Sequence, residues 1–297
     1  MKTTTVTLQN TKSLLKPRPK DSHKGTFGTV NAVVGCARYR GAATLSVMGA
    51  LRSGAGIVRL CSTEKVCSAV TVQYPSATLL PLPETADGYI AKTAVSAVLS
   101  AIKPTDALLL GCGLGQCTDT GHAVNLLISA AKCRKVIDAD ALNLLASTGA
   151  LPEVKKNGTL CGCVITPHPG EMSRLTGKSI AEISENMEAV AQEFSIEYGC
   201  VTVLKSHKTV IALPSEETLY ISELGNSGLA KGGSGDVLAG LIAGFIAQGY
   251  NEKDSALLGV CVHGTAADLC AKELSMQAML PSDLGTYICR VFKELDA

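Results

Sequence analysis

Short apolar runs of strand length alternate with longer segments of helical pattern along most of the chain. Several of the short runs are apolar at every position, which is typical of strands whose two faces are both covered by helices. Regular alternation of such strands with helices predicts an α/β fold with a doubly wound, mostly parallel sheet flanked by helices on both faces. The predicted strands are residues 30–34, 57–60, 107–110, 135–137, 164–165, 201–204, 209–213 and 219–221, the last two forming a hairpin.

The longer segments predict the helices, at residues 42–52, 122–131, 179–198, 236–248, 254–272 and 284–292. No Pro- or Ser-rich linker, internal repeat or low-complexity segment divides the chain. We therefore expect a single domain over residues 1–297, in which residues 1–22 form an N-terminal extension packed on the core.

Four loops rich in glycine or polar residues follow predicted strands, at residues 111–115, 138–140, 166–171 and 205–209. In open α/β sheets, ligands bind beyond the carboxyl ends of the strands, in the loops that lead into helices. We therefore expect the four loops to share one crevice at this edge of the sheet.

The turn Gly232-Gly233-Ser234-Gly235-Asp236 leads directly into the apolar helix predicted over residues 236–248. Such a turn lets successive backbone N–H groups converge on one point, where the start of the helix adds partial positive charge. An anionic phosphoryl group would be stabilised there, and Asp236 could take a proton from an attacking hydroxyl. On this motif alone, the alternative that Asp236 only caps the helix remains open.

Two carboxylates, Asp138 and Asp140, follow the strand over 135–137. They could line a polar cavity or help to organise Mg²⁺ through water. The alternative for Asp140 is that it caps the helix that starts at Ala141.

Three further features have both a functional and a structural interpretation. His168 lies between two prolines, which hold its backbone extended, and it could contact a ribose, phosphate or amide, or be structural. Lys205 begins the sequence Lys-Ser-His-Lys-Thr, which suits a nucleotide phosphate but could also be a solvated turn between strands. The small residues Gly41, Ala42 and Ala43 could admit a bulky ligand to a helix start, or allow tight packing of that helix on the sheet.

Composition excludes several classes of function. A net charge of +1 and the absence of Trp argue against a nucleic-acid partner, and no apolar run is long enough for a membrane span. The twelve cysteines are scattered through apolar runs, as expected in a reducing cytoplasm, and their spacing does not indicate a metal site. The glycines at 111, 113 and 115 lack the full dinucleotide fingerprint, and no Walker-type phosphate loop is present.

Taken in order, the motifs resemble those of the ADP- or ATP-dependent NAD(P)H-hydrate dehydratases, a branch of the ribokinase-like superfamily. The resemblance runs from about His23 to the final helix. It rests on the segments 23–28 (HKGTFG), 41–43 (GAA), 51–56 (LRSGAG), 136–145 (VIDADALNLL), 166–172 (TPHPGEM) and 225–236 (GNSGLAKGGSGD).

This resemblance implies a lyase that repairs NADHX and NADPHX, the C6-hydrated forms of NADH and NADPH. ADP would phosphorylate the C6 hydroxyl, and elimination of phosphate would restore the cofactor, with Mg²⁺ bridging the nucleotide phosphates. The roles that it implies are a base at Asp236, which also contacts substrate, an anion hole at Gly233, Ser234 and Gly235, nucleotide contacts at Lys205, Ser206, His207, Lys208, Thr209 and Gly235, and substrate contacts at Ala42, Gly113 and His168.

The sequence departs from the family pattern at two places. Lys231 stands where many members of the family have a small polar residue, just before the glycines. The loop at residues 205–209 reads Lys-Ser-His-Lys-Thr, where Lys-Gly-x-x-Thr is commoner. The family also leads us to expect a cytoplasmic homo-oligomer, a tetramer in many members. We expect no epimerase domain, so a separate epimerase would act upstream.

Two alternatives remain at this stage. A ribokinase-like kinase of a vitamin precursor or sugar would share the glycine turn but release a stable phosphorylated product. A nucleotide-sensing module without catalytic activity would bind nucleotide equally well after Asp236→Ala.

Overall fold

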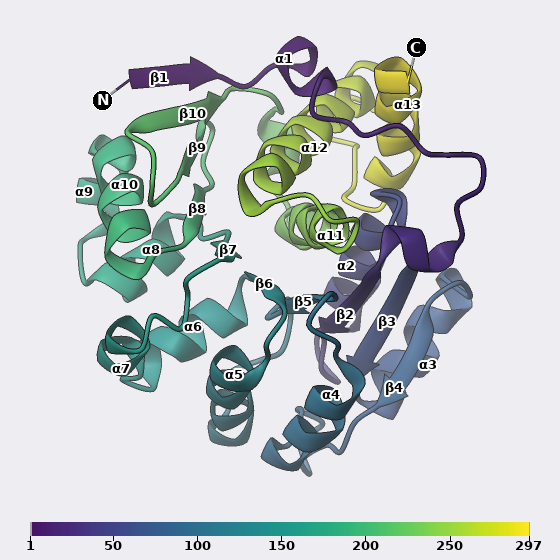
Figure 1. Cartoon of the computed structure of the whole chain (residues 1–297), viewed down its shortest axis with the longest axis vertical. Helices are drawn as coiled ribbons and strands as arrows, with labels where there is room; N and C mark the ends of the chain where they lie inside the picture. Colours follow the sequence, from purple (N-terminus) through teal and green to yellow (C-terminus); the bar gives the residue numbers. More distant parts are fainter. Residues whose placement is uncertain (1, 297) are drawn as a thin grey trace.

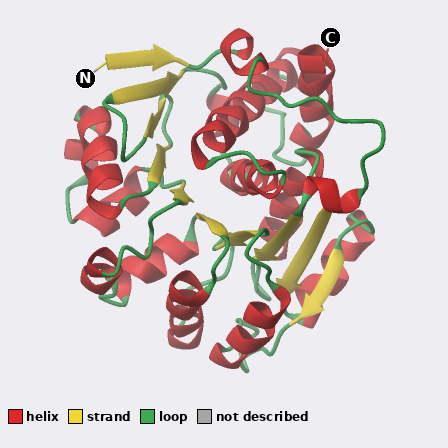
Figure 2. Ribbon diagram, viewed as in Figure 1, coloured by secondary structure: helices red, strands yellow, loops and turns green. Residues whose placement is uncertain are grey.

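The computed structural model describes residues 2–296, which form one sheet covered by helices on both faces (Figures 1 and 2). The 10-stranded sheet has the order β1-β10-β9-β8-β7-β6-β5-β2-β3-β4. Only β9 runs antiparallel to its neighbours. The strands are β1 (Lys2–Thr5), β2 (Thr29–Val33), β3 (Ile57–Ser62), β4 (Thr78–Pro81), β5 (Ala107–Leu110), β6 (Arg134–Ile137), β7 (Cys163–Ile165), β8 (Val201–Leu204), β9 (Thr209–Ala212) and β10 (Thr218–Ser222).

The helices divide between the two faces, which confirms the predicted doubly wound architecture. Figure 1 shows one group inside the curve of the sheet: α2 (Arg40–Arg52), α11 (Ser234–Ala247), α12 (Glu252–Leu274) and α13 (Leu284–Asp296), with α3 (Glu64–Gln73) packed beside α2. The other group covers the outer face: α4 (Val95–Ala101), α5 (Thr118–Ala130), α6 (Asp140–Ser147), α7 (Leu151–Lys156), α8 (Pro169–Thr176), α9 (Ile180–Glu185) and α10 (Met187–Tyr198).

The fully apolar strands bury both of their faces. In β5, Ala107 and Leu109 belong to the hydrophobic cluster beneath α2 and α11, while Leu108 and Leu110 belong to the cluster beneath α4 to α10. Since successive side chains of a strand point to opposite faces, an unbroken apolar run is what such a central strand requires.

The strand order reverses between β2 and β5. The chain builds β3 and β4 on one side of β2, then returns to build β5, β6, β7 and β8 on the other side. At this switch point the two outgoing loops are joined by backbone hydrogen bonds, from Gly35 N–H to Cys112 O (2.8 Å) and from Gly111 N–H to Val33 O (3.2 Å). Switch points of this kind are where doubly wound sheets bind ligands.

Two sequence-based predictions need correction. The single helix expected over residues 179–198 is two helices, because Asn186 leaves the helical conformation (φ −131°, ψ 40°) and separates α9 from α10. The N-terminal segment does more than pack on the core. Its strand β1 pairs in parallel with β10 and extends the sheet, and it is followed by α1 (Leu8–Lys12).

The predicted hairpin over 209–221 is confirmed by the antiparallel pairing of β9 and β10.

A cavity of about 420 Å³ lies between the N-terminal segment and α12, and none of the predicted site residues lines it. Within residues 2–296, no helix is both long enough and apolar enough to cross a membrane.

Candidate active site

The glycine turn lies at the start of α11, which is held tightly against α2. A Cβ atom on Gly240 would lie 2.2 Å from the Ser46 carbonyl oxygen, and one on Gly49 would lie 2.3 Å from that of Val237. The two helices can approach this closely only because both positions are glycine. The packing fixes where α11 begins, and therefore where its first N–H groups point.

Gly233 is the N-cap of α11 and has a left-handed backbone (φ 106°, ψ −18°). This conformation favours glycine and turns the chain abruptly into the helix. The Ser234 hydroxyl is buried and has no partner within the described structure. Asp236 lies in the first turn of α11, so the anion-hole residues and the candidate base are adjacent.

His263, in the middle of α12, contacts the backbone of this turn. Its Nε2 lies 3.0 Å from the Ser234 carbonyl oxygen. Burial lowers the pKa of His263 to about 4. The imidazole is therefore neutral at physiological pH, and its Nε2–H donates to Ser234 without adding charge to the site.

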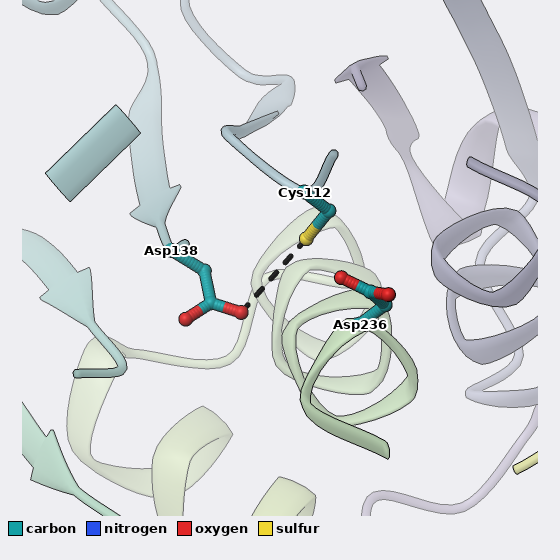
Figure 3. A group of neighbouring side chains, drawn as sticks. All are labelled: Cys112, Asp138 and Asp236. Atoms are coloured by element: carbon teal, nitrogen blue, oxygen red, sulfur yellow. Dashed lines mark hydrogen bonds between the residues drawn. The ribbon is translucent and has the colours of Figure 1, made fainter. Parts of the chain in front are cut away.

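Asp236 faces a buried thiol and a second carboxylate. Figure 3 shows Cys112, Asp138 and Asp236 turned toward one another, and their ligand atoms all lie within 4.8 Å of one another. Burial and the charge of Asp138 raise the pKa of Asp236 to about 7. Burial also raises the pKa of Cys112 well above its usual range, so the thiol is protonated and can donate to the Asp138 carboxylate 3.9 Å away. A carboxylate with a pKa near neutrality is suited to general base catalysis.

Lys205 joins three of the four predicted loops. Its ammonium lies 2.8 Å from Asp138 Oδ1, and its backbone N–H donates to the Pro167 carbonyl oxygen at 2.8 Å. A Cβ on Gly235 would lie 3.2 Å from the Lys205 Nζ. Burial lowers the pKa of Lys205, but Asp138 and Glu171 outweigh it and hold the pKa above its usual value. The Lys205 side chain is therefore held in a partly buried ion pair with the buried Asp138, and the alternative of a solvated turn is wrong for this side chain.

The rest of the 205–209 loop points elsewhere. Ser206 and His207 are exposed and contact each other, with Oγ and Nδ1 3.3 Å apart. Lys208 pairs with Glu188 of α10 at 2.7 Å, and Thr209 begins β9. Asp138 and Asp236 form the acidic cluster of the site. Within residues 2–296, Lys205 is the only residue of this loop that pairs with it.

His168 is the N-cap of α8, and its extended backbone (φ −88°, ψ 168°) is as predicted. Its Nδ1 accepts from Gly170 N–H (3.0 Å), so the ring proton is on Nε2, 3.3 Å from Glu171 Oε1. Burial and then Lys205 lower the pKa of His168, which keeps the half-exposed ring neutral. Burial raises the pKa of Glu171 to about 7.

Asp140 does not cap α6. Its carboxylate accepts from the Gly115 N–H at 2.8 Å and from Gln116 Nε2 at 3.1 Å, so it ties the loop after β5 to the loop after β6. The N-cap position is taken by Ala139, which makes no side-chain capping bond and has φ 54°. The capping interpretation was therefore wrong, and Asp140 is a link between two of the predicted loops.

The remaining substrate candidates lie at the switch point. A Cβ on Gly113 (φ +63°) would be 2.6 Å from the Ala42 Cβ and 2.8 Å from the Tyr39 Cβ. The loop after β5 and the first turn of α2 are therefore in direct contact. The two predicted residues, Ala42 and Gly113, are neighbours on the same side of the candidate site.

Lys231 points away from the glycine turn. Its ammonium donates to the carbonyl oxygens of Gln277 (2.6 Å) and Met279. It therefore binds the segment between α12 and α13 to the residues before the turn. Lys231, which departs from the family pattern, therefore has a structural contact in the folded protein.

The acidic cluster contains the donor types that would accompany Mg²⁺, but not a closed metal cage. Mg²⁺ prefers oxygen ligands and usually retains water and substrate phosphates, and a protonated thiol such as that of Cys112 is a poor ligand for it. The residues therefore fit Mg²⁺ held mainly by nucleotide phosphates, with Asp138 and Asp236 close enough to act through water.

Sequence reasoning missed two residues of this site. Cys112 was considered only as a buried hydrophobe, although it lies in the glycine-rich loop after the strand over 107–110, between Gly111 and Gly113. His263 lies within an apolar helix and no pattern marks it. The place of Cys112 in a predicted ligand loop could have indicated it, whereas the contact of His263 with Ser234 depends on how two helices pack.

The mostly parallel sheet with its switch point and the glycine turn before α11 form a ribokinase-like fold. A ribokinase-like superfamily protein from Enterococcus faecalis matches this fold with a TM-score of 0.80 at 24% identity, over 99% of this chain and 96% of that one. A family model for NAD(P)H-hydrate dehydratase matches residues 30–290. The chain belongs to the NAD(P)H-hydrate dehydratase family.

Individual relatives agree with this assignment. An ADP-dependent (S)-NAD(P)H-hydrate dehydratase from Bacillus subtilis is 33% identical over 98% of both chains. The crystal structure of an ADP/ATP-dependent NAD(P)H-hydrate dehydratase from Bacillus subtilis, co-crystallised with ATP/Mg²⁺, has a TM-score of 0.82 at 31% identity, with 97% of each chain covered. A bifunctional NAD(P)H-hydrate repair enzyme from Moorella thermoacetica is 37% identical over 96% of this chain, which spans only 53% of that protein's length.

Proposed function

We propose that this protein is an ADP-dependent (6S)-NAD(P)H-hydrate dehydratase. The observation that carries the proposal is the placement of Asp236 in a member of this family: it lies directly after a left-handed glycine turn, beside Asp138 and Cys112. The turn offers converging N–H groups to a phosphoryl group, and the carboxylate, with a pKa of about 7, is poised to accept a proton.

The proposed reaction has two stages. The C6 hydroxyl of the hydrate attacks the terminal phosphorus of ADP, its proton passes to Asp236, and AMP leaves. Phosphate then leaves with the C6–O bond while C5 loses a proton, which forms the C5=C6 double bond of NADH or NADPH. The first stage converts a poor leaving group, hydroxide, into a good one.

Each remaining residue has a proposed role in this reaction. N–H groups of Gly233, Ser234 and Gly235 form the anion hole, and Lys205 contacts the nucleotide phosphates while balancing Asp138. The remaining loop residues contact the AMP portion: Ser206 and His207, which are exposed, and Lys208 and Thr209, which are partly buried. Ala42, Gly113 and His168 contact the hydrate. Mg²⁺, bound to the nucleotide, would neutralise charge on its phosphates.

The test combines purified protein, NADHX, Mg²⁺ and either ADP or ATP, and follows the absorbance of the dihydronicotinamide ring of NADH. We expect NADH to form with ADP, with equal release of AMP and phosphate. The matched control is Asp236→Asn, which keeps the side-chain shape and removes the base. No NADH with either nucleotide would contradict the proposal, and a stable phosphorylated product would indicate a kinase instead.

Three properties of the whole protein belong to the same proposal. They are a cytoplasmic location, a homo-oligomeric state with a tetramer as the expected form, and a separate epimerase that supplies the S hydrate. Light scattering of the purified protein measures the oligomeric state. Repair of R-NADHX by the protein alone would contradict the need for a separate epimerase.

A further inference from the structure

The loop that leaves β2 ends in the sequence Arg38-Tyr39-Arg40, to which the motif analysis gave no role. This loop is one side of the switch point, since Gly35 N–H donates to the Cys112 carbonyl oxygen at 2.8 Å. Tyr39 is the N-cap of α2 and contributes no side-chain hydrogen bond to that helix. Its presence there is therefore not explained by helix capping.

Tyr39 is 51% exposed, and among residues 2–296 no other Phe or Tyr ring is exposed. Aromatic residues make up only 4% of the chain, and most of them are packed against other side chains. A tyrosine ring has a large apolar body that is normally covered. At the switch point, where doubly wound sheets bind ligands, an uncovered ring offers a face on which a planar ligand group can stack.

Tyr39 also belongs to the wall that holds the substrate candidates. A Cβ on Gly113 would lie 2.8 Å from the Tyr39 Cβ, 3.1 Å from the Tyr39 carbonyl oxygen and 2.6 Å from the Ala42 Cβ. A ligand that touches Ala42 and Gly113 therefore lies beside Tyr39.

The charges around the ring select the kind of ligand. Arg38 and Arg40 on either side of Tyr39 are exposed, and neither forms an ion pair with a carboxylate in the described part of the chain. The Arg40 Nε donates only to the Ala37 carbonyl oxygen, at 3.1 Å. A ring whose two neighbours along the chain are exposed arginines without a carboxylate partner suits a heterocycle that carries phosphate, rather than a neutral apolar surface.

The distance along α2 fits a dinucleotide. Leu45 reaches the glycine turn, because a Cβ on Gly233 would lie 2.3 Å from its Cδ1. Tyr39 precedes Leu45 by six residues, so the two are about 9 Å apart along the helix axis at 1.5 Å per residue. A ligand that reacts at the glycine turn and lies along the first turns of α2 would reach Tyr39 with its more distant part.

We propose that Tyr39 is a specificity-determining residue whose ring stacks on a heterocycle of the hydrated dinucleotide substrate. This inference rests on the proposed dehydratase function, because it names the part of the site that recognises the hydrate. The two heterocycles of the dinucleotide, adenine and the hydrated nicotinamide, share the chemistry of a nitrogen-containing ring attached to a phosphorylated ribose.

The test compares Tyr39→Ala with Tyr39→Phe in steady-state assays with either NADHX or ADP varied. We expect Tyr39→Ala to raise the KM for NADHX on the order of 10-fold, the lower part of the range for loss of one stacked base, with kcat and the KM for ADP unchanged. Tyr39→Phe retains the ring face and should stay within about twofold of the wild type. Because the ring is exposed, both variants should keep the wild-type Tm.

The hydrated form of reduced nicotinamide mononucleotide, which lacks adenylate, separates the two rings. A KM that rises for NADHX only assigns the contact to adenine, and one that rises for both substrates assigns it to the nicotinamide end. An unchanged KM for NADHX in Tyr39→Ala overturns the inference, as does a rise in the KM for ADP.

A binding measurement separates failure of this inference from failure of the proposed function. Titration of NADH, the reaction product, is followed by its fluorescence and needs no turnover. If the wild type repairs no NADHX but Tyr39→Ala weakens NADH binding, the ring contact stands and the dehydratase function fails. If the wild type is active and Tyr39→Ala binds NADH as tightly as the wild type does, the contact is wrong.

Discussion

Asp236 is held in an environment that costs folding stability. Its carboxylate is partly buried, lies near Asp138, and has a pKa of about 7 against a reference of 3.8. Because the folded protein binds this proton more tightly than the unfolded chain does, the contribution of Asp236 to the free energy of unfolding is most favourable below pH 3.8 and falls as the pH rises toward 7. A catalytic base with a near-neutral pKa thus comes at the expense of stability.

Asp236→Asn should separate these two effects. We expect the variant to lose roughly 10³-fold in kcat, as for removal of a general base, and to gain ~2 kcal/mol in the free energy of unfolding at pH 8. The gain should vanish at pH 4, where the wild-type carboxyl is already protonated. Denaturant titrations at both pH values measure the free energy of unfolding, and NADHX turnover measures kcat. A near-wild-type rate would refute the assignment of the base.

The same pKa predicts the pH dependence of repair. If Asp236 acts as the base, kcat/KM should rise with pH to a plateau, with a midpoint near the pKa of about 7. The Cys112 thiol, which donates to Asp138 and lies beside Asp236, lowers the pKa of Asp236, so Cys112→Ala should move the midpoint to higher pH. Cys67→Ala, another fully buried cysteine, is the control and should leave it in place. A midpoint that does not move would show that the thiol has no influence on the base.

At this scale the sequence identified the main residues but not their partners. Asp236, Lys205 and His168 were recognisable from glycines, prolines and strand ends. The Lys205–Asp138 ion pair and the Gly115–Asp140 bond join residues 67 and 25 positions apart, and such contacts depend on the order and alignment of the strands in the sheet. The sequence pattern does not contain that information.

At the scale of elements, the close approach of α2 and α11 determines the position of the glycine turn. The long apolar run of residues 236–248 predicted the helix, and the structure adds the reason for the glycines within it. The break between α9 and α10 was missed because 179–198 has a helical pattern throughout. Strand β1, Lys-Thr-Thr-Thr, was missed because all four residues are exposed and show no alternation.

Gly240→Ala tests this packing. The added Cβ would lie 2.2 Å from the Ser46 carbonyl oxygen, so the helices must separate. We expect a loss of about 1–3 kcal/mol in the free energy of unfolding and a lower kcat, because the start of α11 moves with the helix. Gly41→Ala, also in a helix but with open space around its Cβ, should leave Tm unchanged. Equal effects on Tm from both variants would contradict the packing argument.

At the scale of the molecule, the N-terminal segment and the site lie at different parts of the sheet. The strand β1 is at one edge, beside β10, whereas the glycine turn faces the switch point between β2 and β5 (Figure 1). Val6 is 2% exposed, and its N–H donates to the Ile221 carbonyl oxygen at 2.7 Å. The segment therefore completes the sheet and covers part of its core without contributing a side chain to the site.

Removal of residues 1–12 should consequently reduce stability and spare catalysis. The deletion uncovers β10 and removes the buried side chains of Val6 and Thr11, so we expect a lower Tm and an increased tendency to aggregate through the exposed edge. Turnover per folded molecule should remain at the wild-type value below the new Tm. The control Thr3→Ala, at an exposed position of β1, should change neither quantity. A deletion variant that keeps its Tm but loses repair activity would show that the edge strand acts on the site.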